Sequence, residues 1–457
     1  MAMSHRKPMR NDTEKERKAL TDTKQSLPSL QKVRLTSCAF MGLGQILYLK
    51  NYAMGLFYAA VEVLALINLP GMIQKIGGLI TLGEQNLSLP VTQRDHSIFM
   101  MIDGILVLAV LLLVAILYWV SVHSTVEEYK LVLRSGQLPG KERKHSQLIE
   151  NLFFGVAMSP TLVLIVVFVL VPLIFSFLVA FTDYSSPNHL PPANTVNWVG
   201  FDNFKDLFGR DANFTTALIH TSIWTLIWGV LATLTCYFGG LIIAELVNNK
   251  HIKLAPIFRT LYILPYAVPA NISMIVWRFM FNGSFGTINK TLAALGLNAN
   301  INWLGDVSLA RIVCIIVNLW AGFPYFMLLA LGTITSISPD IFEAATIDGC
   351  SGFKRFWKIT LPLVLRQNTP LIIMGLCKNL NNFGAIFFLT GGNPTTSYST
   401  ATSAKGTDIL VTWIYSLTID LLKYNYASAL AVLVFLVLAP FAIFNFVNTK
   451  SFKEGEL

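Results

Sequence analysis

The sequence of 457 residues is poor in charge: only 13% of it is Asp, Glu, Lys or Arg, whereas soluble globular chains carry roughly a quarter. It has only five cysteines, with no C-x-x-C pair and no His/Cys cluster at metal-ligand spacing, so neither a disulfide framework nor a metal site is expected. A G-x-x-x-x-G-K-[ST] loop is also missing, which argues against nucleotide hydrolysis by this chain. These absences exclude an ordinary soluble enzyme, and we expect no catalytic residue and no cofactor.

The sequence contains long segments without any charged residue, and several exceed the roughly 20 residues that are needed to cross about 30 Å of hydrocarbon. They predict an all-α polytopic membrane protein with about eight transmembrane helices, near residues 52–69, 98–122, 156–182, 217–247, 259–281, 312–335, 370–389 and 428–448. The uncharged segment 36–49 is short and contains glycine, so we expect it to be interfacial or re-entrant rather than a full crossing.

The basic residues carry information through their placement. The net charge of +9 would suggest phosphate contacts in a nucleic-acid binder. Sorted by loop, however, 24 Lys and Arg lie in segments that are cytoplasmic if the N-terminus is inside, and 9 lie in the opposite loops. Because basic residues are retained on the cytoplasmic side, both termini are predicted to lie in the cytoplasm. The chain is thus expected to be a cell-membrane protein that contacts lipid and no nucleic acid.

Carboxylates inside the predicted spans are few. Glu62 is the one near the middle of a span, and we expect it to bond to a neighbouring helix. Ion-coupled carriers usually bury such groups to bind protons or sodium, so their scarcity weakens the hypothesis of a secondary transporter without excluding it.

The segment 338–362, between the sixth and seventh predicted spans, has clear helix signals. Ser338 is a suitable N-cap for a helix starting at Pro339, and Gly349 supplies its stop. A second helix is predicted to begin at Ser351 and to end before Pro362. It places Phe353, Phe356 and Trp357 on one face, which suits either a knob for a partner's groove or an interfacial helix; both remain open on these grounds.

This segment resembles the EAA loop of the permease subunits of ABC importers, whose consensus is EAA-x-x-DGA followed by I-x-LP. The matching residues are Glu343, Ala344, Ala345, Asp348, Gly349, Phe356, Ile359, Leu361 and Pro362. Cys350 and Arg366 depart from the pattern. The resemblance implies that the segment docks into a cleft of an ATPase subunit, with Glu343, Ala344, Ala345, Asp348, Gly349, Phe353 and Phe356 as the coupling residues.

Further segments are similar to the same family from about residue 156 onward, among them Phe181–Tyr184, Asn213–Thr221 and the run from Arg259 to Pro269 with Trp277. Together they resemble the larger membrane subunit of maltose/maltodextrin-type importers. The resemblance implies an ABC type-1 (MetI-like) core over 212–448. Before it come a basic arm with a short segment (1–50), two extra helices with a loop (51–150) and a third helix with a short external loop (151–211); a cytoplasmic tail (449–457) follows. The implied partners are a second, shorter permease, a dimeric ATPase and an extracellular or periplasmic sugar-binding protein.

Polar residues interrupt the sixth and seventh spans. Amides, a phenol and aromatic faces suit a neutral sugar, but hydrogen bonds and small-residue packing between helices explain the same residues. Asn379 and Asn382, three apart, are predicted to share one helix face. By resemblance to the maltodextrin-type permeases the sugar site consists of Asn318, Ala321, Gly322, Tyr325, Gly375, Asn379 and Asn382. Lys378 replaces an apolar or aromatic residue there.

The sequence thus predicts the transmembrane subunit of an ATP-driven importer for maltose, maltodextrin or a related oligosaccharide. The alternatives are a permease for another carbohydrate or a polyol phosphate, an ion-coupled sugar carrier, and a membrane scaffold or sensor.

Overall fold

The computed structural model describes residues 28–86, 88–90, 93–135, 157–158, 160–189, 194–249, 252–297 and 300–447. The basic arm before residue 28, the segment 136–156 and the tail after residue 447 lie outside these residues. The chain divides into two compact units, one formed by residues up to Phe175 together with Asn194–Val196, and one formed by Ser176–Ala193 and Asn197–Leu457.

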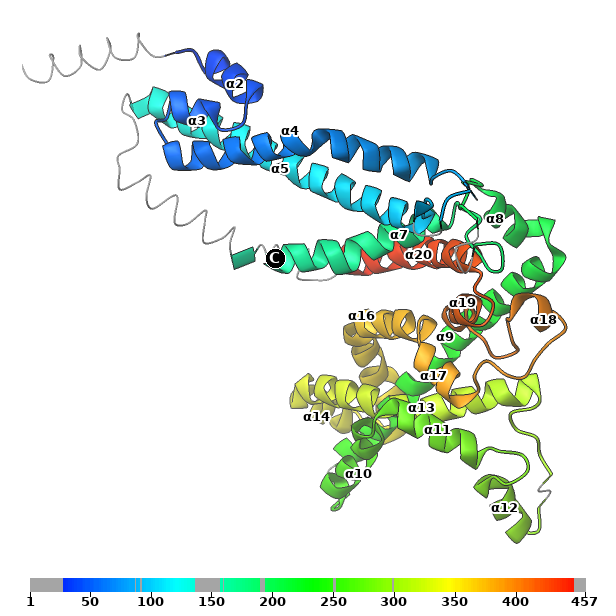
Figure 1. Ribbon diagram of the computed structural model, residues 1–457. Helices are drawn as coiled ribbons and strands as arrows, with labels where there is room; N and C mark the ends of the chain where they lie inside the picture. Colours follow the sequence, from blue (N-terminus) through cyan, green and yellow to red (C-terminus); the bar gives the residue numbers. More distant parts are fainter. Residues whose placement is uncertain are drawn as a thin grey trace, which may run out of the picture. The chain divides into compact units, whose positions relative to one another are not determined.

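The first unit is built on two long helices, α4 (Tyr52–Thr81) and α5 (Ser97–Ser135), which lie side by side (Figure 1). Small residues allow this contact: a Cβ atom on Gly104 would lie 2.4 Å from Leu79. Lys75 and Asp103 form an ion pair of 3.1 Å between the two helices. Helix α4 extends beyond the predicted end at residue 69, and Lys75 in this extension finds its partner on the next helix.

Two short helices precede this pair, α2 (Leu30–Ala39) and α3 (Leu43–Leu47). At 10 and 5 residues neither reaches the length of a membrane crossing. The carboxylate of Glu62 accepts a hydrogen bond from the backbone N–H of Met41, in the turn between them. Glu62 thus has a structural partner, although that partner is a turn rather than a neighbouring helix.

The second unit is organised around α9 (Ala212–Asn248) and α13 (Val307–Ser336), which pack together at its centre (Figure 1). A Cβ atom on Gly240 would lie 2.6 Å from the backbone nitrogen of Met327, so only glycine permits the backbones to approach this closely. Around them lie α8 (Asp202–Lys205), α10 (Ala255–Ala267), α11 (Ala270–Met280), α12 (Thr287–Ala294), α14 (Pro339–Ile347), α15 (Gly352–Arg355), α16 (Leu361–Leu380), α17 (Phe383–Leu389), α18 (Ser399–Thr402), α19 (Leu410–Ile419) and α20 (Tyr424–Val447). The helix Pro160–Val179, which includes α7 (Val171–Val179), leads into this unit.

The prediction of an all-α membrane protein is confirmed. In the described part of the chain, six helices are long and apolar enough to cross a membrane, or seven if the bent pair α10–α11 counts as one. The eighth predicted span corresponds to α20, which contains the shorter apolar helix Tyr424–Pro440. About eight crossings therefore remain the expected number.

The fifth predicted span is not one straight helix. The axes of α10 and α11 differ by 92° across Val268 and Pro269. Proline has no N–H to continue the helix and pushes the residue before it into an extended conformation, and Val268 has φ −84° and ψ 136°. The span predicted near 259–281 is therefore present as two helices that meet at a sharp bend, and not as one straight helix.

Candidate functional site

Segment 338–362 folds as a helix, a glycine turn and a second helix. Ser338 caps α14 by accepting a hydrogen bond from the Asp340 N–H at 3.4 Å, and Pro339 is the first residue of the helix. Gly349 has φ +72°, a left-handed conformation that favours glycine. Ser351 caps α15 through the N–H of Lys354, also at 3.4 Å. The predicted caps at Ser338 and Ser351 and the glycine stop at Gly349 are confirmed. They could be predicted because each depends on neighbouring residues along the chain.

The second helix of the segment does not end before Pro362, as was expected. It continues from α15 through a π-helical turn, Phe356–Thr360, directly into α16, so that Gly352–Leu380 is one helix of 29 residues. In that turn the N–H of Leu361 bonds to the carbonyl of Phe356. The wider turn accommodates the proline ring and its missing N–H at the start of α16.

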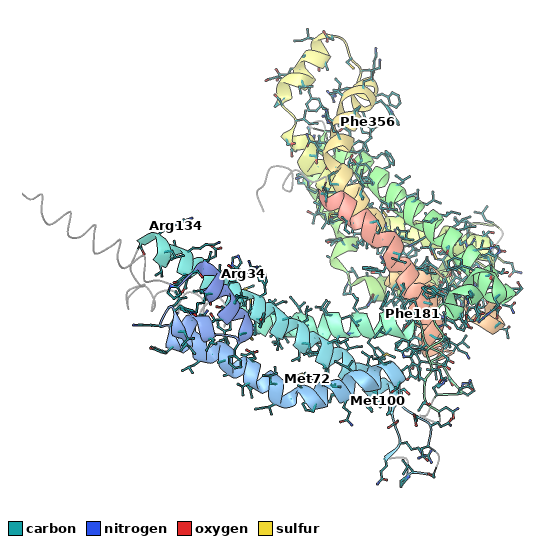
Figure 2. All side chains as sticks on the ribbon, turned by 90° about the horizontal axis from the view of Figure 1, so that it is seen from above. Arg34, Met72, Met100, Arg134, Phe181 and Phe356 are labelled. Atoms are coloured by element: carbon teal, nitrogen blue, oxygen red, sulfur yellow. The ribbon has the colours of Figure 1, made fainter. Side chains whose placement is uncertain are left out.

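Apolar side chains protrude from this segment. Ile347 is 86% exposed, Phe353 77% and Trp357 53%, and we call these three the docking patch. The Phe353 and Trp357 rings lie 6.2 Å apart. Figure 2 shows the segment at one end of the second unit, marked by Phe356, with Phe181 toward the other end.

The other residues predicted for coupling divide by exposure. Glu343, Ala344 and Asp348 are exposed on or beside α14, whereas Ala345 is buried and Phe356 packs against the core formed by α9, α13 and α16. Ala345 and Phe356 therefore hold the segment in place rather than present a surface. Arg355 lies 5.6 Å from the ring centroid of Phe342 and joins α15 to α14 by a cation–π contact.

All of the predicted sugar-site residues except Asn382 lie on two helices, α13 and α16, which pack on α9. On α16, Asn379 is buried and donates a hydrogen bond to the Thr233 hydroxyl at 2.9 Å, while its backbone carbonyl accepts one from the Trp228 indole at 2.9 Å. Gly375 faces the same point, since a Cβ atom there would lie 3.5 Å from the Thr233 methyl group and 2.8 Å from Phe326. This half of the set joins α16 to α9.

The residues on α13 face a second point on α9. The buried Asn318 donates from its side-chain amide to the Cys236 sulfur at 3.4 Å, and its backbone carbonyl accepts a hydrogen bond from the Cys236 thiol at 3.3 Å. A Cβ atom on Gly322 would lie 2.7 Å from the same sulfur. Ala321 is half-buried beside them.

Asn382 and Tyr325 are the more open members of the set. The chain breaks after Leu380, and Asn382 caps α17 instead of continuing α16, so the expectation that Asn379 and Asn382 share one helix face is wrong. The Asn382 amide still points toward the Asn318 side-chain oxygen, at 3.5 Å. Tyr325 stacks on Tyr266 with ring centroids 6.3 Å apart.

Lys378 lies beside this open side. Its ammonium nitrogen is 5.9 Å from the Tyr325 ring centroid, and within the described residues it forms no ion pair. A cation within a membrane helix is costly unless it faces a partner or a hydrated cavity. Lys378 therefore indicates that this side of α16 is not exposed to lipid.

One cavity was not predicted. It has a volume of 670 Å³ and lies between the end of α11, Leu304 and the turn after α17. Arg278 and Phe388 are among its lining residues. Arg278 at a helix end beside Trp277 was the available sequence signal, but the cavity itself results from packing between distant segments.

The loop behind that turn contains a buried acid. Asp408 is 2% exposed and accepts hydrogen bonds of 2.8 Å from the Lys405 N–H and the Thr412 hydroxyl. Burial raises the pKa of Asp408 to about 6.

The chain is similar to known transport proteins. A family model described as "Binding-protein-dependent transport system inner membrane component" matches residues 236–451. The galactooligosaccharides transport system permease protein GanP of Bacillus subtilis is 34% identical over 377 residues, which are 82% of this chain and 88% of that protein. The maltodextrin transport system permease protein MalC of Streptococcus pneumoniae is 30% identical over 421 residues, 90% of this chain and 94% of that protein.

Two other similarities cover less. The maltose/maltodextrin transport system permease protein MalF of Klebsiella aerogenes is 38% identical over 264 residues, 57% of this chain and 51% of that protein. A crystal structure of a bacterial ABC transporter involved in the import of the acidic polysaccharide alginate contains a chain that matches with a TM-score of 0.53 and 23% identity. The match covers 67% of this chain and all of that one, and it bears on the fold alone.

Proposed function

This chain belongs to the binding-protein-dependent transport system inner membrane components, the permeases of ABC importers, and from that premise we propose that it forms half of a translocation path for maltodextrins or galactooligosaccharides. It is a multi-pass membrane protein and a transport subunit rather than an enzyme. The proposed partners are a second permease, two ATPase subunits and a sugar-binding protein. The proposed orientation places both termini and segment 338–362 in the cytoplasm.

One observation carries the proposal: the docking patch and the predicted sugar site are joined by continuous helices. The unbroken helix Gly352–Leu380 begins beside Phe353 and includes Asn379, a distance of roughly 40 Å at 1.5 Å per residue. Helix α13 ends at Ser336, two residues before the cap of α14, and carries Asn318 and Tyr325. Movement of segment 338–362 is therefore transmitted to both helices that hold the predicted site.

This arrangement supports a mechanism of alternating access. ATP-driven closure of the ATPase pair pulls segment 338–362 inward, and the two attached helices tilt as levers against α9. ATP achieves this because it binds one conformation of the assembly better than the other. Helices α16 and α13 contact α9 at Thr233 and Cys236. These contacts must either break or persist when the two helices tilt.

The open residues then form the saccharide-facing surface. Tyr325 offers a phenol and a ring face, and Asn382 offers an amide whose contact with Asn318 is long for a hydrogen bond. Asn318 and Asn379 already form hydrogen bonds with α9, so we assign them to supporting Tyr325 and Asn382 rather than to direct contact with the saccharide.

The test is coupling to the ATPase. We expect Glu343→Lys, which reverses an exposed charge on α14, to abolish stimulation of the ATPase in the reconstituted complex. Gly349→Pro should do the same, because proline cannot adopt a φ of +72°. Asp420→Lys, a matched reversal at an exposed acid after α19, is the control. Normal stimulation in both loop variants would refute the coupling role and favour an interfacial helix.

A further inference from the structure

The cavity beside α11 lies far from the docking patch. Its lining residue Leu304 just precedes α13, whereas segment 338–362 follows the other end of that helix. Thirty residues of helix, roughly 45 Å, separate the two. In the proposed orientation the cavity therefore opens toward the outer face of the membrane. Its volume of 670 Å³ falls within the range of roughly 300–1,000 Å³ that is typical of ligand sites.

The lining combines aromatic surface with one cation. Phe279, Phe387 and Phe388 contribute rings, and the last two meet edge to face with centroids 5.3 Å apart. Arg278 is the single charged residue of the lining, and among the described residues its guanidinium has neither an ion pair nor a hydrogen bond. A guanidinium can donate to two neighbouring oxygens at once, and a ring face packs on the C–H face of a pyranose.

The floor of the cavity is held in place by hydrogen bonds. The Thr390 and Thr407 hydroxyls lie 2.7 Å apart, and the Gly392 N–H donates to the Thr390 hydroxyl at 3.2 Å. The Thr407 N–H donates to the Gly392 carbonyl at 2.9 Å, and the Asn393 amide donates to the Thr390 carbonyl at 3.1 Å. A turn fixed in this way loses little freedom when a ligand binds, which favours affinity.

We infer that this cavity is an outer saccharide subsite, in which Arg278 donates hydrogen bonds to adjacent hydroxyls of one sugar unit and Phe387 and Phe388 pack on its ring. It shares no residue with the predicted site around Asn318 and Asn379. A neutral sugar fits better than an acidic one, because a single cation among three phenylalanines is poorly suited to a chain with a carboxylate on each unit. The inference rests on the proposed function and extends it: the subsite would hold the far end of a long oligosaccharide.

The experiment measures selection by length in the complete transporter, reconstituted with its binding protein and ATPase. Maltose and maltoheptaose compete in one equimolar uptake assay; if the wild type rejects both, galactobiose competes with a galactooligosaccharide of about five units instead. In Arg278→Gln and in Phe388→Ala, the uptake of the long sugar relative to the short one is expected to fall about tenfold. This is the effect expected when one or two hydrogen bonds, or one ring contact, are lost. Lys290→Gln, on α12 outside the lining, is the matched control and should keep the ratio.

Each outcome is informative. Arg278→Lys keeps the charge but loses the two-pronged donor, so it should resemble Arg278→Gln; wild-type selection in this variant would overturn the assignment of a neutral diol. An unchanged ratio in Arg278→Gln and Phe388→Ala, or an equal loss for both sugar lengths, would overturn the subsite and point to a face covered by the second permease. A wild-type complex that imports none of these sugars would instead refute the proposed function.

Discussion

Replacement of Phe353 by alanine tests the docking patch most sharply. The side chain is 77% exposed in this chain and lies at the start of the helix that leads to Asn379. Full burial of a phenylalanine contributes roughly 1.5–3 kcal/mol, so the exposed part would contribute about 1–2.5 kcal/mol when an ATPase cleft covers it. At 1.4 kcal/mol per factor of ten, the affinity for the ATPase should fall roughly 5- to 50-fold.

The assay is the dissociation constant between the detergent-solubilised permease pair and the ATPase. Phe285→Ala is the matched control, because Phe285 is 56% exposed and lies between α11 and α12, away from the patch. It should change the constant less than about twofold, as is usual for residues outside an interface. Wild-type affinity in Phe353→Ala would refute the assignment of the patch as an ATPase contact.

Three other changes test separate parts of the structure. Gly240→Ala places a Cβ atom 2.6 Å from backbone of α13 and should lower stability by about 1–3 kcal/mol in thermal unfolding, whereas Gly332→Ala, with open space around it, should be harmless; equal melting temperatures would contradict the close packing. Asn379→Ala combined with Asn382→Ala should impair sugar uptake while the ATPase still co-purifies, and normal uptake would assign both to packing alone. Burial raises the pKa of Asp408 from 3.8 to about 6, so the stability that the protonated acid contributes is full below pH 4 and is lost as the pH rises through 6, by at most about 3 kcal/mol. Asp408→Asn should flatten this pH dependence of the melting temperature. An unchanged pH profile in this variant would refute the raised pKa.

Much of the helix inventory could be predicted from the sequence, because a membrane imposes long uncharged runs that can be counted. The caps at Ser338 and Ser351 and the turn at Gly349 were also predictable, since each depends on neighbours along the chain. The extension of α4 past Lys75 was not, because the ion pair with Asp103 comes from the next helix.

The errors occur where backbone geometry was inferred from a single signal. Pro362 was read as a stop, but a π turn carries the helix through it; Pro269 was accepted inside a span, but it bends the chain by 92°. The break after Leu380 left no clear mark in the sequence. The contacts of Asn379 with Thr233 and the cavity at Arg278 depend on packing between segments more than 100 residues apart and could not be read from a single sequence.

Uptake of labelled oligosaccharide into proteoliposomes tests the central claim most directly. The vesicles contain the complete complex with or without internal ATP, and with the proton gradient intact or collapsed by an ionophore. The account predicts that uptake requires ATP and survives collapse of the gradient. Uptake that follows the gradient and proceeds without ATP would contradict it.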